Sequence, residues 1–275
     1  MSQDIIIYPS GDTSNSNPFI IFSGGNTDYI IEMTPDGFLD ISMDEHIVSY
    51  GLVMNLDAGN LNSYSGGTTL YDLSGEGNNA TLVNGPVVVP NQNGGVVQVD
   101  GSNDYISVSN MPTGNTWSIM MWTLIDGPTV FSVTGHRTYA STDNFRFQWD
   151  DKGVNNAYAP FVDFVSPNGG AVGFFSKPET DIFNKWNMVT MTCDGTTVRQ
   201  YWNDDISPTT TTARNFSSNG NMQIGYNGLS GIGGVDLFNR DGGNCYFGNV
   251  MVYNRGLTEA EVLQNYNEQK DRFTL

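Results

Sequence analysis

From about residue 50 onward, short apolar segments alternate with clusters of turn residues, and this pattern constrains the fold more than any other feature. Residues 117–124 are so rich in Trp, Ile and Met that a strand there would be buried on both faces. The candidate strands are 52–56, 95–99, 105–108, 117–124, 145–149, 161–164, 172–175, 186–193, 198–202, 222–226 and 245–253. Many short strands with almost no helix predict an all-β, two-sheet antiparallel sandwich.

One helix signal stands near the carboxy terminus. Thr258 and Glu261 have the spacing of a capping box, in which the hydroxyl and the carboxylate each accept a backbone N–H of the first turn. Val262, Leu263 and Tyr266 follow at helical spacing and are predicted to lie on one face. We therefore expect one short helix that closes a side of the sandwich.

Residues 1–48 are predicted to be a separate, small and acidic β module, ahead of a sandwich over residues 49–275. Four apolar or alternating runs, separated by Gly, Pro, Asn and Asp clusters, are typical of a meander or two hairpins. A sheet of this size is marginal alone. The module contains no chemical motif, so we interpret it as an anchor or adaptor.

The charge is strongly acidic and uneven. The chain carries 29 acidic and 11 basic residues, a formal charge of −18, and its first basic residue is Arg137. Such a surface repels nucleic-acid phosphates, so a nucleic-acid partner is not expected. Two interpretations of the acidic first half stay open: solubility in a crowded assembly, or a cationic partner surface or divalent cations.

Cys193 and Cys245 are the two cysteines of the chain, and we expect free, buried thiols rather than a disulfide framework. Met1 to Ser10 lacks the features of a signal peptide. No apolar run approaches the roughly 18 residues that a membrane span needs. We expect a protein made in a cytoplasm that does not insert into membranes.

Several loose markers occur together between residues 50 and 270. They are Asp-Leu-Ser-Gly at 72–75, Asp-Gly-Ser-Asn-Asp-Tyr at 100–105, Trp117-Ser118, Trp186, Asp194-Gly195, Ile224-Gly225, and Val-Tyr-Asn-Arg at 252–255 before the capped helix. In these markers the chain resembles laminin-G-like domains of the concanavalin-A-like lectin and glucanase fold. This resemblance implies a binding platform. The whole chain looks most like the domains found in structural proteins of tailed-phage particles.

The resemblance also implies a structural Ca²⁺ site, with Asp72, Asp100 and Asp104 as candidate ligands. Calcium takes six to eight oxygen ligands, and Gly-rich loops can turn carbonyls toward it. The alternative is that these aspartates cap turns through nearby backbone amides. Asn249 departs from the family pattern, because relatives often carry a carboxylate there.

Other residues have a structural and a ligand-binding interpretation. Arg255 is expected to clamp the last turn through a carbonyl or carboxylate. The aromatic residues that sugar rings could stack on, with core packing as the alternative, are Trp149, Tyr158 and Trp202. The doubled carboxylates Asp150-Asp151 and Asp204-Asp205 are interpreted as solvated loop tips, with contacts to cations or sugar hydroxyls as the alternative.

No sequence motif for catalysis is present. The paired carboxylates of a Glu-x-Asp-x-x-Glu glucanase strand are missing, as are the common serine-hydrolase, zinc-protease and phosphate-binding motifs. We therefore expect a non-enzymatic protein. The resemblance implies a virion surface protein, a head decoration or fibre subunit that is multimeric on the particle. It would contact other virion proteins through residues 1–48 and bind host glycans weakly. The alternative is a receptor-binding tail adhesin or a cell-surface lectin.

Overall fold

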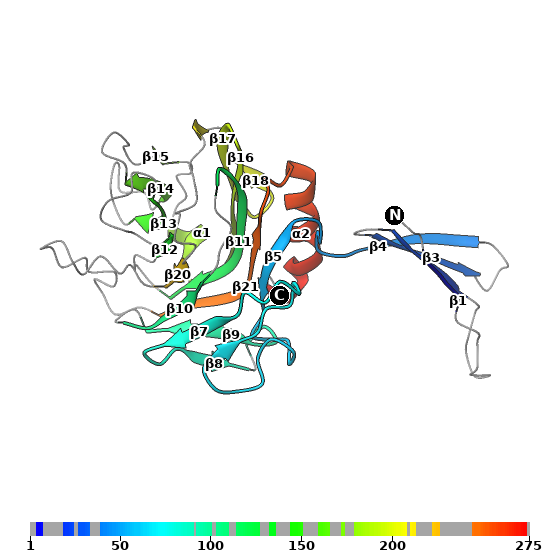
Figure 1. Cartoon of the computed structure of the whole chain (residues 1–275), viewed down its shortest axis with the longest axis horizontal. Coiled ribbons are helices and arrows are strands. Elements are labelled where there is room, and N and C mark those ends of the chain that lie inside the picture. Colours follow the sequence, from blue (N-terminus) through cyan, green and yellow to red (C-terminus); the bar gives the residue numbers. More distant parts are fainter. Residues whose placement is uncertain are drawn as a thin grey trace, which may run out of the picture.

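The chain folds into two large antiparallel sheets that lie face to face, with a helix against the outer face of one of them (Figure 1). The computed structural model describes residues 4–7, 19–24, 27–33, 39–90, 92–100, 103–109, 114–126, 132–135, 144–150, 159–165, 172–173, 179–207, 210–212, 222–225 and 244–273. The predicted two-sheet antiparallel sandwich is confirmed.

The first large sheet has nine strands. It contains β5 (Leu52–Leu56), β8 (Val87–Val89), β9 (Val96–Val99), β11 (Thr116–Ile125), β16 (Trp186–Asp194), β17 (Thr197–Trp202), β18 (Asp205–Ile206), β19 (Thr211–Thr212) and β21 (Cys245–Tyr253). Strand β11 is central and pairs with β16 on one side and β21 on the other. Its residues are buried on both faces, as the Trp- and Met-rich sequence predicts.

The second large sheet has eight strands. It contains β6 (Thr69–Leu70), β7 (Ala80–Val83), β10 (Tyr105–Val108), β12 (Ser132–Gly135), β13 (Asn144–Asp150), β14 (Ala159–Val165), β15 (Val172–Gly173) and β20 (Met222–Ile224). The order runs from β15 at one edge to β6 at the other. The short strands β6, β7, β8, β12, β18 and β19 were not among the predicted ones.

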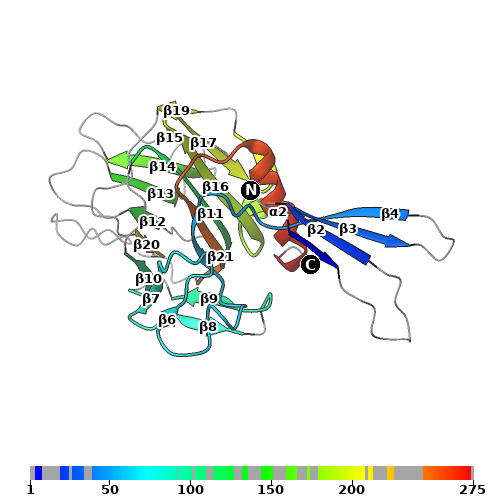
Figure 2. The ribbon, with the colours of Figure 1, turned by 45° about the vertical axis from the view of Figure 1, so that its right-hand side comes forward.

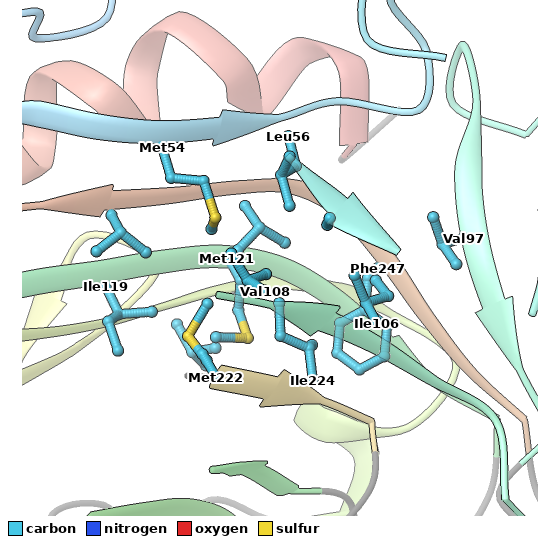
Figure 3. Close-up of a cluster of buried hydrophobic side chains, with 14 of the residues drawn as sticks. Met54, Leu56, Val97, Ile106, Val108, Ile119, Met121, Met222, Ile224 and Phe247 are labelled. Carbon is cyan, nitrogen blue, oxygen red and sulfur yellow. The ribbon is translucent and has the colours of Figure 1, made fainter. Parts of the chain in front are cut away.

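The main core lies between the two sheets. Figure 3 shows Met54 and Met121 of the nine-stranded sheet directed toward Ile106 and Ile224 of the eight-stranded sheet. Cys193 and Cys245 also lie in this core as free thiols, which confirms that prediction. Burial raises the pKa of the Cys245 thiol to about 12, with a smaller contribution from the charge of Asp126. This thiol is therefore unreactive at neutral pH.

The carboxy-terminal helix α2 (Glu259–Phe273) covers the outer face of the nine-stranded sheet (Figure 2). It runs for 15 residues and is longer than the short helix expected. The assignment of its faces was partly wrong: Leu263 is 42 % exposed, whereas Asn265 is completely buried. A second helical element, the single turn α1 (Glu179–Ile182), was not predicted. Among the described residues, no helix has the length and apolarity needed to cross a bilayer.

The helix begins with the predicted capping box. The Thr258 N–H donates to Glu261 Oε2 at 2.8 Å, and the Glu261 N–H donates to Thr258 Oγ1 at 3.3 Å. Arg255 donates two hydrogen bonds to the same carboxylate and a third to the carbonyl of Tyr50, so its predicted clamping role is confirmed. The Arg255 guanidinium is the main reason why the pKa of Glu261 falls to about 2.

The amino-terminal strands β1 (Asp4–Ile7), β2 (Phe19–Gly24), β3 (Thr27–Met33) and β4 (Leu39–Glu45) form a four-stranded meander. Figures 1 and 2 place this sheet beyond α2, away from the sandwich. Each strand pairs with the next in the sequence.

Residues 46–51, here called the strap, connect this sheet to the sandwich and are hydrogen-bonded to α2. The Val48 N–H donates to Asn265 Oδ1 at 2.7 Å, and the Val48 carbonyl accepts the Tyr253 hydroxyl at 2.9 Å. Gln264 Nε2 donates to the carbonyl of His46 at 2.7 Å. The buried Asn265 amide also donates to the Tyr253 hydroxyl. The connection is therefore fixed to the sandwich by polar contacts that are mostly buried.

Candidate functional site

A pocket of about 530 Å³ opens where α1, the start of β16, the β17–β18 turn and the end of α2 meet. Its lining combines aromatic, amide and charged side chains. The lining residues are Asp181, Asn184, Lys185, Trp186, Asn187, Trp202, Asn203, Asp204, Asp205 and Phe273. Residues up to 92 positions apart in the sequence thus share one concave surface.

Two asparagines shape the turns at the pocket wall. Asn184 and Asn203 have φ values of 58° and 54°, a left-handed conformation that asparagine tolerates better than most residues. Asn203 Oδ1 accepts a hydrogen bond from the Met188 backbone N–H at 2.8 Å. The Asn203 backbone N–H donates to the Met188 carbonyl at 2.7 Å. The Asn184 N–H donates to the Ile125 carbonyl at 2.8 Å. The wall is therefore tied to the β-sheet backbone.

Asn187 connects the two sides of this wall. Its side chain is only 4 % exposed, and its Nδ2 lies 3.2 Å from the carbonyl of Asp181 and 3.3 Å from that of Lys185. Its Oδ1 accepts a hydrogen bond from Asn203 Nδ2 at 3.1 Å. A buried amide with these contacts holds α1 against the β17–β18 turn, so the pocket is preformed.

The aromatic part of the pocket continues into the interface between α2 and the sheet. Phe273 lies 5.0 Å from Trp186, measured between ring centroids, and stacks on Trp122 at 4.7 Å. Tyr266 stacks on the same indole at 5.7 Å. Trp202, by contrast, belongs to the core between the sheets. Phe273 is 2 % exposed and Trp186 is 9 % exposed, so these rings are fixed by packing and only a small part of the Trp186 indole reaches the pocket.

The charged lining residues are three carboxylates and one ammonium group. Lys185 Nζ lies 3.9 Å from Asp181 Oδ1, a distance at which the pair interacts weakly because both side chains are half exposed. Asp204 and Asp205 extend from the β17–β18 turn. Burial raises the pKa of the nearby Tyr266 phenol, and the charges of these two aspartates raise it further. The lining is therefore negative overall.

The predicted calcium ligands do not come together. Asp72 lies before β7 and accepts four hydrogen bonds, three from its own loop and one from β5. They come from the Asn55, Ser74 and Asn78 backbone N–H groups and from the Ser74 hydroxyl, at 2.7–2.9 Å. With both carboxylate oxygens engaged, Asp72 acts as a turn cap, which was the alternative interpretation.

Asp100 and Asp104 lie at the other end of β7, where Tyr105 pairs with Val83. The pKa of Asp104 is raised, first by burial and then by the charge of Asp100. In the part of the chain that the structure describes, no three His, Cys, Asp or Glu side chains gather as a metal-binding group. The three-aspartate set therefore does not fit a calcium ion, because Asp72 is separated from the other two by the length of β7.

Among the remaining predicted residues, Trp202 and the Asp204-Asp205 pair do meet in the pocket. Trp202 is only 3 % exposed, so most of its surface serves core packing. The Trp149 and Asp150 side chains, and residues Asp151 and Tyr158, lie outside the described residues. Sequence reasoning missed Asn187, Asn203 and Phe273 as pocket residues; the run Asn203-Asp204-Asp205 between two strands was the available signal for a polar turn.

Comparisons with known proteins agree with this architecture. The laminin-G type model of the concanavalin A-like lectin/glucanases superfamily matches residues 100–263. No curated protein sequence matches the chain.

Solved structures with a similar fold are binding domains of clostridial toxins. The binding domain of Paraclostridial mosquitocidal protein 1 has a TM-score of 0.58 at 15 % identity, over 80 % of this chain and 52 % of that one. The receptor-binding domain of botulinum neurotoxin type G has 0.57 at 14 %, over 80 % and 51 %. The ligand-binding domain of serotype D, in complex with N-acetylneuraminic acid, has 0.58 at 13 %, over 80 % and 52 %. The chain thus spans about half the length of these structures, and the likeness is one of fold.

Proposed function

Because the chain belongs to the concanavalin A-like lectin/glucanases superfamily, we propose that its sandwich is a non-enzymatic glycan-binding domain. The observation that carries this proposal is the pocket at Trp186, where the small exposed part of a fixed indole lies beside amide and carboxylate groups. Sugars match such a surface, because their rings present C–H patches to aromatic side chains and their hydroxyls hydrogen-bond to amides and carboxylates.

The internal contacts of the pocket favour binding over catalysis. Asn187 and Asn203 are held by hydrogen bonds to backbone groups and to each other, which suits them to positioning a ligand. Glycoside hydrolysis needs an acid and a nucleophile or base, of which the acid has a raised pKa.

The glycan-binding proposal is tested with a glycan array probed by the full chain, with and without Ca²⁺. The second assay titrates any glycan that binds on the array into the full chain and monitors binding by tryptophan fluorescence. We expect binding in the weak range typical of single lectin sites, and we expect Asp204→Asn to weaken it. Glu76→Gln makes the same change from carboxylate to amide on an exposed loop far from the pocket and should leave binding unchanged. No binding on the array in either condition would refute the proposal.

We further propose that residues 1–48 anchor this domain on a virion surface, as a head decoration or fibre subunit present in several copies. The support is the placement of the four-stranded sheet beyond α2, away from the sandwich, and the acidity of the first half of the chain. A tethered array of weak sites gains avidity without any new contact.

The anchor is tested by mixing purified particles that lack this protein with the full chain or with a chain that begins at residue 46 and so keeps the strap. The full chain should bind and the truncated one should not. Equal binding by both chains would show that residues 1–45 are not the anchor. Mass spectrometry of purified particles then distinguishes a virion protein from a cell-surface lectin, and imaging of the particles distinguishes a head or fibre location from a tail adhesin.

A further inference from the structure

We infer that the pocket at Trp186 prefers sugars that carry a protonated amine over neutral sugars, and neutral sugars over anionic ones. This inference rests on the proposed glycan-binding function and names the class of ligand. It follows from the charges that line the pocket and from their position beside the aromatic surface.

The first step is the sign of the lining. Asp181, Asp204 and Asp205 face the pocket with Lys185 as the one cation among its lining residues. The Lys185 ammonium group lies 3.9 Å from Asp181, so its charge is partly balanced within the wall. A ligand that enters the pocket therefore meets an excess of negative charge, which favours an ammonium group and opposes a carboxylate.

The second step is where the excess charge is located. Asp204 and Asp205 occupy the β17–β18 turn, and they raise the pKa of Tyr266 on the neighbouring helix, after the larger effect of burial. The only ammonium group that the described contacts place near this phenol is that of Lys270, 5.8 Å from the ring centroid. Asp204 in the turn and Asp205 at the start of β18 therefore lie near α2 as well as in the pocket lining.

The third step is the aromatic surface. Trp186 is 9 % exposed and is held against Phe273, so it cannot turn away from the pocket. Trp is the best aromatic partner for a cation. An amino sugar therefore meets only the small exposed part of this indole, and the charge of its ammonium group is recognised by the carboxylates of Asp204 and Asp205.

The same charges oppose the anionic sugar found with the serotype D toxin domain. N-acetylneuraminic acid carries a carboxylate, which would have to approach Asp204 and Asp205. Like charges in contact reduce affinity unless a cation lies between them. A shared fold with that domain thus does not imply a shared ligand.

The experiment compares oligosaccharides that differ mainly in charge, titrated into the full chain and followed by tryptophan fluorescence and calorimetry. The probes are oligomers of glucosamine, N-acetylglucosamine and glucose, and N-acetylneuraminic acid. We expect the glucosamine oligomer to bind about fivefold to tenfold tighter than the glucose oligomer at low salt, the range of a partly exposed charge-assisted contact. The difference should shrink between about 20 and 300 mM salt as screening shortens the reach of the charges.

Variants assign the preference to the pocket. Asp204→Asn combined with Asp205→Asn should abolish the preference for glucosamine over glucose oligomers, because an amide still accepts hydrogen bonds but carries no charge. Glu76→Gln should keep the preference. If the double variant also keeps it, the preference comes from the net charge of the chain and the inference is wrong.

The remaining outcomes separate the two proposals. Equal affinity for glucosamine and glucose oligomers, or tighter binding of N-acetylneuraminic acid, overturns the inference while glycan binding stands. No binding of any probe, together with a silent array, overturns the proposed function and the inference with it.

Discussion

Replacing Tyr253 by phenylalanine removes one oxygen atom from the network that holds the strap to the sandwich. Tyr253 is completely buried, and its hydroxyl donates to the Val48 carbonyl at 2.9 Å and accepts from Asn265 Nδ2 at 3.0 Å. The variant leaves that carbonyl and that amide without their partner. An orphaned buried group costs about 1–3 kcal/mol, and the Asn265 amide costs only about 1 kcal/mol because it keeps its contact to Met120 Sδ at 3.1 Å. We therefore expect Tyr253→Phe to lower the free energy of unfolding by about 2–4 kcal/mol.

The assay is urea unfolding of the full chain, followed by tryptophan fluorescence. With an m-value of about 3 kcal/mol/M, the midpoint should fall by about 1 M with no change in slope. Tyr71→Phe is the matched control: Tyr71 is 48 % exposed, and its variant should stay within about 0.5 kcal/mol of wild type. Hydrogen exchange at the Val48 amide, which donates to Asn265, should become faster in Tyr253→Phe. A midpoint within about 0.2 M of wild type, with unchanged exchange at Val48, would refute the reasoning.

Two further predictions concern charged contacts of α2. Arg272 donates two hydrogen bonds to Asp57 and one each to the carbonyls of Asn93 and Gly95, so Arg272→Ala should destabilise the chain by about 2–3 kcal/mol. Arg272→Lys should restore less than half of this loss in urea unfolding, because lysine lacks the planar fork; full recovery would contradict the bidentate geometry. The folded-state pKa of Glu261 is lowered to about 2, so its stabilising effect is present above the unfolded-state pKa of about 4.5 and is lost as the pH falls toward 2. The stability difference between wild type and Glu261→Gln should therefore be largest above about pH 5 and vanish near pH 2, and a constant difference would show that the charge does not matter.

The structural features that were predicted correctly from the sequence are those that depend only on residues close together in the chain. The capping box at Thr258 and Glu261 needs only a spacing of three residues, and both of its backbone hydrogen bonds are formed. The Asp194-Gly195 hairpin is also local: Gly195 has a φ of 94°, and Asp194 Oδ1 accepts the N–H of Thr196. Such patterns specify strands, turns and the helix start without knowledge of what packs against them.

The faces of α2 depended on distant residues and were partly mispredicted. Apolar spacing favoured Leu263, but the helix buries Asn265 and Gln269 instead. The reason is the strap: the backbone of Val48 needs hydrogen-bond partners in a buried position, and an amide on the helix provides one. No pattern within residues 258–273 could reveal this need, because Val48 lies 217 residues before Asn265.

The pocket could not be predicted for the same reason. Asn187 and Asn203 are ordinary polar residues in the sequence, and only the pairing of β16 with β17 brings their side chains to 3.1 Å. The positions of the three candidate calcium ligands also depended on the arrangement of the strands. A run rich in aspartate and glycine suggested one cluster, but β7 separates Asp72 from Asp104, and local backbone N–H groups satisfy the first of them.

Helix α2 physically links the two regions to which we assign function. Asn265 holds the strap, and Phe273 lines the pocket eight residues later, about 12 Å along the helix axis. The stacking of Tyr266 and Phe273 on Trp122 fixes the helix to the sheet between these points. A pull on a glycan in the pocket would therefore reach the amino-terminal sheet through a rigid element rather than through a flexible linker. Such an arrangement suits a domain that must keep its orientation while it holds a ligand against a load.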